Sequence, residues 1–447
     1  MLNSDQISYI IIIQVLFQLG LFVDNFIMSL FKEIRSDRCD LSYLFSNIAV
    51  LLRYVTLSIF KDSKRPPMGA YLVTWSAIIA YCYVYIFSMH WFIFVRCQET
   101  GDLVAASVVF SLGTNSSTCV TKFIFMKYYR EEMCELISRY LECDTKVAPK
   151  TRFHTNLQKQ LKVVKRRALS VWMCLVGIAY LYASMALLRP GRHFPEDLYV
   201  VYGLEPPFET PNYEISLFLM ALSITVAVYQ LSAVKALVIV MIGYVESQVL
   251  ALSEECLQIW NDVSEENDKR HQNSFDEERQ TDGHPREEIM NLQIRFKLVN
   301  ILQFHAYSVK LLQDFEKLYR WISFVDFMMI VFAIISELLG KVQNTYLEIP
   351  YTVVQIYIDC YIGQKLTDAN EVFCNAIYDC KWENFDVKNR KIVLMLLRNS
   401  QKPIEVTAGG ISPLNYATFM SIMKTSYSAY TTLQSSKTTL RANSTFK

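Results

Sequence analysis

The first three long apolar segments of this chain each contain at least 19 consecutive residues without Asp, Glu, Lys or Arg. About 20 apolar residues span the core of a bilayer, so each of these segments predicts a transmembrane helix. Four further apolar runs approach this length, although charged residues fall inside them. The sequence therefore predicts an all-α membrane protein with seven transmembrane helices, at about residues 69–95, 102–126, 168–188, 214–244, 319–341, 346–366 and 409–434.

The composition agrees with a membrane protein and argues against other classes. Hydrophobic residues make up 52% of the chain and charged residues 19%, below the roughly 25% of soluble domains. The net charge of +1 creates no field that would attract nucleic acid. Hydrolase, metalloprotease and nucleotide-binding motifs are absent, and the eleven cysteines form no CxxC pair. We therefore expect no enzyme activity, metal or cofactor, and cysteines that act as small buried apolar residues.

Basic residues gather in alternate loops and predict the orientation. Seven lie before the first span and eleven between the second and third spans, at residues 127–167. The other loops are short or acidic, as at Glu99 and Asp102 and at Glu196 and Asp197. Because Lys and Arg stay on the cytoplasmic side, the N-terminus is predicted inside the cell. Seven spans then place the C-terminus outside, the reverse of a G-protein-coupled receptor.

The N-terminal part, residues 1–67, is predicted to be cytoplasmic or interfacial. Its apolar run at 7–31 carries a single charge, Asp24. No basic region precedes this run and no small-residue cleavage site follows it, which argues against a cleaved signal peptide. An extra span, a re-entrant or interfacial segment and an incorrect gene start all remain open, and we favour the second. Residues 41–60, interrupted by Arg53, predict an interfacial helix.

The largest predicted cytoplasmic loop, 245–318, follows the four-span unit 68–244. Its part 261–288 has only two large apolar residues and is predicted to be disordered. A helical pattern follows, whose apolar residues recur every three or four positions along about 35 Å: Leu292, Phe296, Val299, Leu302, Ala306, Val309, Leu312 and Phe315. This helix either packs on its own bundle or continues into the fifth span and joins an assembly domain. Within 319–402, residues 368–398 are a candidate second helix of that domain.

Charged residues inside the predicted spans are expected to mark function or a buried pair. They are Lys235, Asp326, Glu337, Asp359 and Lys424. One interpretation pairs Asp359 with Lys424 in the inner half of the bundle. In the other, Lys235 extends toward the interface and Asp359 reaches a wet cytoplasmic crevice. The sequence leaves both open.

The outer halves of several spans suggest a ligand pocket. Aromatic and small apolar residues recur there, with a few hydroxyl groups. Each alone is more typical of ordinary helix packing, and only their clustering at one depth favours a pocket. Such walls suit a small, volatile, weakly polar molecule. The candidate ligand-binding residues are Phe110, Val109, Ala106, Tyr182, Ala186, Phe218, Tyr351, Val354 and Tyr357.

The last span, within residues 403–436, is unusually rich in Ser, Thr, Tyr, Asn and Gln. Hydrocarbon penalises these groups unless protein or water satisfies them, so this helix is a candidate pore lining. One helical face carries Tyr427, Thr431 and Gln434 at spacings of four and three, and Tyr430 flanks it. Leu433 or one of its neighbours would close a constriction. Residues 437–447 would form an extracellular tail.

Motifs near the C-terminus resemble those of the insect odorant receptor family. They are Tyr361-Ile-Gly-Gln, Ala376-Ile-Tyr-Asp-Cys-Lys-Trp, and a last span with Thr407-Ala-Gly-Gly, Pro413-Leu-Asn and Thr425-Ser-Tyr-Ser. The resemblance covers about residues 65–435, and only the apolar run 7–31 departs from the family pattern. It implies an odorant-specific subunit of an odorant-gated, non-selective cation channel. It also implies a hetero-tetramer with an olfactory co-receptor, a pore lined by the seventh span, and the plasma membrane of sensory neuron dendrites.

Three alternatives remain beside this interpretation. A gustatory receptor would share the architecture and respond to contact ligands. A G-protein-coupled receptor would need a cytoplasmic C-terminus, and a transporter would show saturable uptake. The odorant itself does not follow from the sequence, because the shape of the pocket depends on the rotation of each helix.

Overall fold

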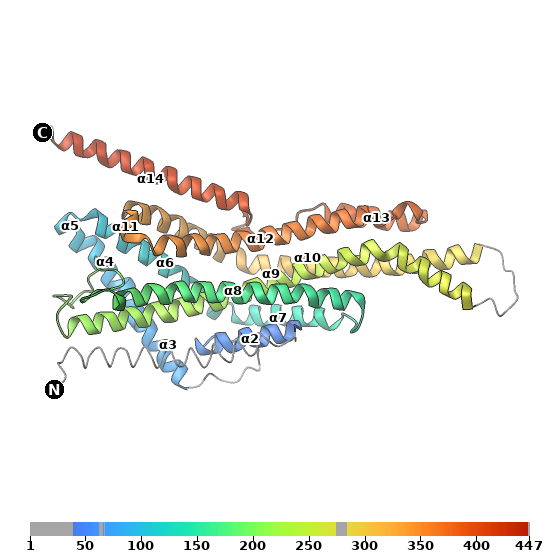
Figure 1. Ribbon diagram of the computed structural model, residues 1–447, viewed down its shortest axis with the longest axis horizontal. Helices are drawn as coiled ribbons and strands as arrows, with labels where there is room; N and C mark the ends of the chain where they lie inside the picture. The colour runs from blue at the N-terminus through green and yellow to red at the C-terminus, as the bar shows by residue number, and fades with distance from the viewer. Residues whose placement is uncertain (1–38, 62–65, 67, 274–283, 446–447) are drawn as a thin grey trace.

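The computed structural model describes residues 39–61, 66, 68–273 and 284–445, so the predicted segment 7–31 lies outside the described residues. Long helices run side by side along the molecule, with α5 and α11 at one end and α13 at the other (Figure 1). We call these the α5 end and the α13 end. The elements are α2 (Leu41–Tyr54), α3 (Met68–Tyr81), η1 (Cys82–Ser88), α4 (Met89–Trp91), η2 (Phe92–Arg96), α5 (Cys97–Thr100), α6 (Leu103–Tyr128), α7 (Arg130–Thr145), α8 (Arg152–Leu188), α9 (Asn212–Asn273), α10 (His284–Leu339), α11 (Val342–Thr345), α12 (Glu348–Tyr378), η3 (Trp382–Asn384), α13 (Val387–Ser400), β1 (Thr407–Ala408), β2 (Ser412–Pro413) and α14 (Tyr416–Thr445).

Five helical stretches are long and apolar enough to cross a membrane, and they contain the first five predicted spans. They are Met68–Thr100, Leu103–Tyr128, Arg152–Ala186, Asn212–Lys269 and Glu287–Leu339. The first of these is continuous from α3 to α5 and includes two π-helical parts, η1 and η2. The sixth and seventh predicted spans form α12 and α14, whose polar side chains dilute their apolar content.

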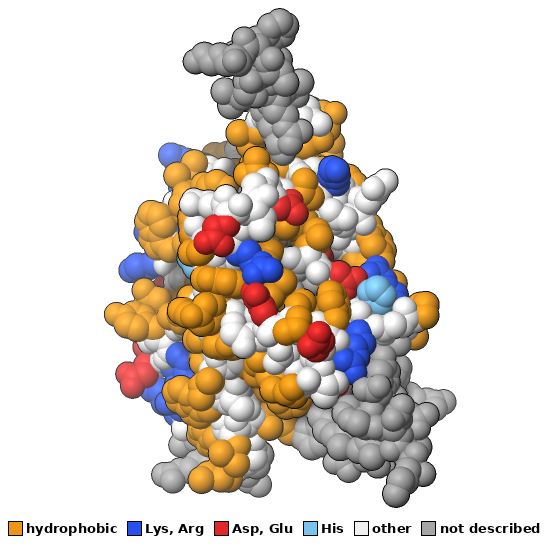
Figure 2. All heavy atoms as spheres, turned by 90° about the vertical axis from the view of Figure 1, so that its left-hand side faces the viewer, with side chains coloured by type: hydrophobic (Ala, Val, Ile, Leu, Met, Phe, Trp, Pro, Cys, Tyr) orange, Lys and Arg blue, Asp and Glu red, His pale blue; other side chains and the backbone are white. Residues whose placement is uncertain are grey.

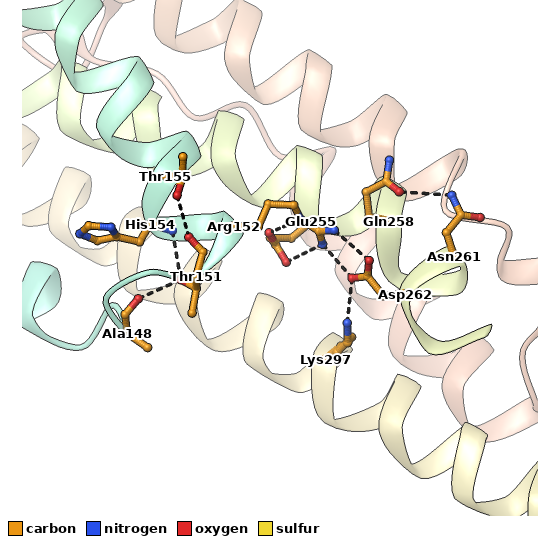
Figure 3. A network of polar contacts seen from close by, with 10 residues as sticks. All are labelled: Ala148, Thr151, Arg152, His154, Thr155, Glu255, Gln258, Asn261, Asp262 and Lys297. Atoms are coloured by element: carbon orange, nitrogen blue, oxygen red, sulfur yellow. Dashed lines mark hydrogen bonds and ion pairs between the residues drawn. The ribbon is translucent and has the colours of Figure 1, made fainter. Parts of the chain in front are cut away.

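The predicted disorder of 261–288 is wrong over part of its length. Helix α9 continues to Asn273, and α10 begins at His284. An ion-pair network holds these helices to α8 (Figure 3). Arg152 donates to both Glu255 and Asp262 at 2.8–2.9 Å, and Lys297 Nζ lies 2.8 Å from Asp262 Oδ2. Asp262, one of the charges that suggested disorder, is therefore a partner for two other helices.

Helix α10 runs without a break into the fifth span, as one of the two interpretations predicted. Its predicted apolar stripe does not pack on the chain's own bundle in the first half, where Leu292 and Phe296 are 58% and 68% exposed. A neighbouring stripe, Ile294 and Leu298, is buried instead. Lys297 lies on that second face, and its ion pair with Asp262 of α9 holds the face inward. At the α13 end, α12 and α13 supply the helices expected within 368–398, and Asn389 of α13 donates to the carbonyl of Asn291 at 2.8 Å.

The last span begins later than predicted, at Tyr416 rather than at 409. Gly409 and Gly410 have φ of +67° and +75° and form a tight turn between β1 and β2. Such φ values favour glycine and interrupt a helix. The hairpin is held on α10, because Thr407 donates to the Glu316 carboxyl group and the Gly409 N–H donates to the Arg320 carbonyl at 2.8 Å. The Asn415 side chain then caps α14 by accepting from the Thr418 N–H at 2.9 Å.

Two apolar clusters form the core. The larger one joins α2 and α6–α13, and the smaller one lies toward the α5 end. Residues 189–211, between α8 and α9, close that end by burying Phe194, Tyr199 and Val201 in the smaller cluster. On the surface of the α5 end, acidic and basic side chains are interspersed with apolar ones (Figure 2), and Arg96 pairs with Glu205 at 2.5 Å. The eleven cysteines are free, and eight of them are buried.

We predict that Gly363→Ala destabilises the protein. A Cβ atom at Gly363 of α12 would lie 2.0 Å from the carbonyl oxygen of Leu414, so α12 and the start of α14 must move apart. Overpacking of this kind costs about 1–3 kcal/mol of unfolding free energy. Thermal unfolding of the purified receptor in detergent measures the effect.

Gly177→Ala in α8 is the matched control, because a Cβ atom there meets no atom within 4 Å. Its thermal unfolding midpoint should equal that of the wild type or exceed it slightly, since Ala stabilises a helix more than Gly does. Equal midpoints for the two variants would contradict the close approach of α12 and residue 414.

Candidate functional site

A cavity of ≈ 80 Å³ lies inside the bundle. Its walls come from the first span, α6, α8, α9 and the start of α12, so residues far apart in the sequence meet there. Aromatic and aliphatic side chains dominate these walls, and hydroxyl, amide and carboxyl groups are few. The lining residues are Tyr81, Tyr85, Leu112, Asn115, Ser116, Cys119, Ile178, Ala179, Tyr182, Ser223, Ile224, Ala227, Val228, Leu347, Glu348 and Tyr351. An apolar enclosure with a few polar groups is typical of a site for a small organic molecule.

Polar residues follow one face of α6 and one face of α12 beside this cavity. On α6 they recur at spacings of four, three and four: Ser111, Asn115, Thr118 and Lys122. On α12 the spacings are the same, at Glu348, Thr352, Gln355 and Asp359. The two stripes meet through short hydrogen bonds, because Ser111 Oγ donates to Glu348 Oε2 at 2.8 Å and Asn115 Nδ2 to Thr352 Oγ1 at 2.5 Å. Glu337 of α10 joins them by accepting from Asn115 and Thr352.

Two buried ion pairs lie further along the same stripes. Lys122 Nζ is 2.5 Å from Asp326 Oδ2, and both side chains are almost fully buried. Lys235 Nζ is 2.7 Å from both oxygens of Asp359 and also donates to the Gln355 carbonyl. The predicted pair of Asp359 with Lys424 is therefore wrong, and Lys424 is exposed on α14. The alternative, in which Lys235 extends toward the interface, is also wrong. Lys235 is buried and pairs with Asp359 of α12.

The loop 189–211 packs against the first span, which lines part of the cavity. Tyr199 donates a hydrogen bond to the Val84 carbonyl in η1, and the Tyr202 N–H donates to Ser88 Oγ at 3.3 Å. Burial raises the pKa of the Glu196 carboxyl group in this loop to about 7, although the Leu198 N–H donates to it. The loop is thus attached to the first span, which also supplies Tyr81 and Tyr85 to the cavity.

The structure brings two of the nine candidate ligand residues, Tyr182 and Tyr351, into the cavity wall. Ala186 and Val109 are buried in the smaller cluster, and Ala106 packs against it. Val354 packs against the larger cluster. Three aromatic residues point outward, with 40–46% of their surface exposed: Phe110, Phe218 and Tyr357. The spacing identified shared helix faces, but it did not reveal which face turns toward the bundle axis.

The five candidate pore residues lie on α14 beyond its first turns. This helix departs from the bundle beyond its first turns (Figure 1). Tyr427 and Leu433 are 61% and 49% exposed, Thr431 and Gln434 are exposed, and Tyr430 is half-buried. Within one subunit, this face therefore lies away from the other helices.

The sequence did not lead us to Lys122 or Glu348 as site residues. Lys122 lies inside the predicted second span and Glu348 near the start of the sixth, but neither was among the charged residues expected to mark function. The repeated spacing of four, three and four on both helices was the signal that could have identified them, because it places polar groups on one buried face. Among the described residues, no group of three His, Cys, Asp or Glu side chains could hold a metal ion.

The fold is similar to that of a solved insect receptor. The olfactory receptor OR5 from Machilis hrabei superimposes with a TM-score of 0.65 at 12% identity, covering 87% of this chain and 97% of that one. Its complex with eugenol gives a TM-score of 0.64 at 13% identity, over 87% of this chain and 97% of that one. At this level of identity the similarity establishes the fold.

Curated relatives match locally in sequence. Odorant receptor 22c of Drosophila melanogaster is 24% identical over 155 residues, which are 33% of this chain and 38% of the relative. Odorant receptor 2a of the same species is 31% identical over 84 residues, 19% of this chain and 21% of the relative. Odorant receptor 10 of Aedes albopictus is 26% identical over 155 residues, 32% of this chain and 40% of the relative. The chain thus matches well under half the length of each of these relatives.

The model of the 7tm Odorant receptor family matches residues 102–427, nearly three quarters of the chain. This range extends from the start of α6 into α14 and includes both ion pairs, the hairpin and all the cavity-lining residues except Tyr81 and Tyr85. A seven-helix architecture agrees with the five apolar helices together with α12 and α14. The protein is therefore a multi-pass, all-α membrane protein that belongs to the seven-transmembrane odorant receptor family.

Proposed function

We propose that this protein is an odorant receptor, which binds a small volatile molecule in the cavity between the first span, α6, α8, α9 and α12. The observation that carries the proposal is the cavity itself, which lies between helices of the bundle and is lined mainly by aromatic and aliphatic side chains. Such a site binds through dispersion and a few hydrogen bonds. The eugenol complex of the similarly folded Machilis receptor supports a small aromatic volatile as the type of ligand.

The same proposal makes the chain one subunit of an odorant-gated, non-selective cation channel, a hetero-tetramer with an olfactory co-receptor. The exposed hydroxyl-rich face of α14 supports a pore at an axis between subunits. Exposed apolar residues at the α13 end, Val387, Leu394 and Met395, support contacts with neighbouring subunits. The channel would lie in the plasma membrane of sensory neuron dendrites, with the N-terminus and the α13 end in the cytoplasm.

Helix α12 offers a route from the cavity to the pore helix. Its first turn supplies Glu348 and Tyr351 to the cavity. Two turns later, Tyr357 stacks on Tyr416 of α14 at a ring-centroid distance of 6.3 Å and meets Phe419 edge-on at 5.7 Å. A ligand that shifts α12 would therefore move the base of α14. The cavity residues set ligand preference, and Tyr357 transmits the change.

We predict that Tyr351→Ala raises the half-maximal odorant dose by amounts that differ between odorants. Loss of a ring that contacts the ligand should cost roughly 1–3 kcal/mol of binding, about a five- to hundred-fold shift. Tyr357→Ala should shift all odorants by a common factor, because this ring contacts α14. Dose–response currents with the co-receptor measure both. If the shift differed between odorants for Tyr357→Ala and not for Tyr351→Ala, Tyr357 would be the ligand contact instead of Tyr351.

The orientation predicts that an epitope after Lys447 stains in intact cells. Basic residues in alternate loops place the N-terminus inside and, after seven spans, the C-terminus outside. An epitope at the N-terminus is the control and should stain only after permeabilisation. The opposite pattern of staining would overturn the inverted orientation.

The pore assignment predicts that cysteines at positions 427, 431 and 434 react with methanethiosulfonate reagents and change the odorant-evoked current. Ser426→Cys is the matched control, because Ser426 is fully buried and should be protected from the reagent. The wild-type receptor shows how far the reagent acts through the native exposed cysteines, Cys82 and Cys174. Unchanged current and ion permeability at all three positions would show that this face does not line the pore.

A further inference from the structure

Of the described residues that line the cavity, only Glu348 carries a carboxyl group. It is the first residue of α12, and the side chain is deeply buried, with the residue only 6% exposed. Its Oε2 accepts a hydrogen bond from Ser111 Oγ at 2.8 Å. Its Oε1 is buried and has no hydrogen-bond partner among the described residues. An acceptor atom therefore stands unused in the wall of an otherwise apolar cavity.

This arrangement is costly without a ligand. A buried acceptor without a partner destabilises a structure, and a buried carboxylate without a cation does so more strongly. Within the part of the chain that the structure describes, no Lys, Arg or His forms an ion pair with Glu348. The two buried lysines nearest in the stripes, Lys122 and Lys235, are paired with Asp326 and Asp359.

Glu337 shows how the fold treats a purely structural carboxyl group. It is also fully buried, but Asn115 and Thr352 both donate to its Oε1, at 3.0 and 2.5 Å. Its Oε2 has no partner among the described residues, yet Glu337 does not line the cavity. Among the described carboxyl groups, only Glu348 combines an unpartnered oxygen with a place in the cavity wall, where Asn115 Oδ1 and the Tyr351 hydroxyl also have no partner among the described residues.

Aromatic rings in the same walls favour a cation. Tyr85, Tyr182 and Tyr351 line the cavity together with Glu348. The face of an aromatic ring attracts an ammonium group, and this attraction is strongest where water is excluded. The hydroxyl group of Tyr351 is also buried without a partner among the described residues. Carboxylate, rings and a spare hydroxyl together match an ammonium head group, while the aliphatic walls match a hydrocarbon tail.

We propose that Glu348 is a specificity-determining residue that selects small volatile amines. The ammonium N–H donates to Glu348 Oε1, the tyrosine rings surround the charged end, and the tail lies against Ile178, Ile224 and Val228. The proposal rests on the proposed function, because it takes the cavity as the odorant site.

The test uses the full-length receptor with its co-receptor and two ligand sets, each of one skeleton. One set is hexylamine, hexan-1-ol and heptane, and the other is 2-phenylethylamine, 2-phenylethanol and propylbenzene. In the wild type, at least one amine should act at a lower half-maximal dose than its alcohol and hydrocarbon. Glu348→Gln should raise the dose of that amine by about tenfold or more and that of the alcohol by less than about threefold, because it removes a charge-assisted hydrogen bond.

Two variants separate this role from a role in folding. Glu348→Asp keeps the charge and should keep the ranking of amine over alcohol, even at reduced sensitivity. Glu337→Gln changes a buried carboxyl group outside the cavity wall and should leave the ranking unchanged. Surface labelling of each variant shows whether it reaches the membrane.

Two outcomes would overturn the proposal. One is a wild type that responds to alcohols or hydrocarbons and not preferentially to either amine. The other is a Glu348→Gln variant whose doses rise equally for all ligands, which would make Glu348 a structural residue. Failure of the proposed function looks different, because the wild type with its co-receptor would then remain silent toward every volatile compound of a broad panel.

Discussion

The architecture depends on two buried ion pairs that join four helices. Lys122–Asp326 connects α6 to α10, and Lys235–Asp359 connects α9 to α12. Where water is scarce, each charge needs its partner, and removal of one partner costs about 3–5 kcal/mol. The pairs therefore fix the rotation of each helix about its own axis. That rotation decides that Asn115 and Glu348 face the cavity and that Phe110 and Tyr357 do not.

The apolar runs predicted the spans well, because a helix that crosses a bilayer needs about 20 consecutive apolar residues. Such a run can be recognised in a single sequence. Partners across helices were not predictable in the same way. The residues of the pair Lys235–Asp359 are 124 positions apart, and the one partner that the sequence suggested for Asp359 was Lys424. Charge density at 261–273 suggested disorder, since the sequence does not show that Arg152 and Lys297 flank Asp262. In the cavity, Tyr182 and Tyr351 were predictable as aromatic residues at the right depth, whereas Glu348 was not.

The cavity and the ion pairs use the same helix faces and differ in chemistry. Along α6, Asn115, Ser116 and Cys119 line the cavity, and Lys122 follows one turn later. Along α12, Glu348 and Tyr351 line the cavity, Asp359 is paired, and Gly363 admits the Leu414 backbone. Along α12, the residues that line the cavity, the residue of the ion pair and the residue that contacts the start of α14 thus follow one another. A change in the first turn of α12 can reach α14 without unfolding any part of the bundle.

The free face of α14 also bears on how such a protein is made in the cell. Its hydroxyl-rich turns, with Tyr427 and Thr431 exposed, are poorly suited to lipid tails. A lone subunit in the endoplasmic reticulum would present this face to hydrocarbon until neighbouring subunits enclose it. Such exposure is a physical basis for retention by quality control and for export of assembled complexes only. The helix proposed to line the pore would then also report whether assembly is complete.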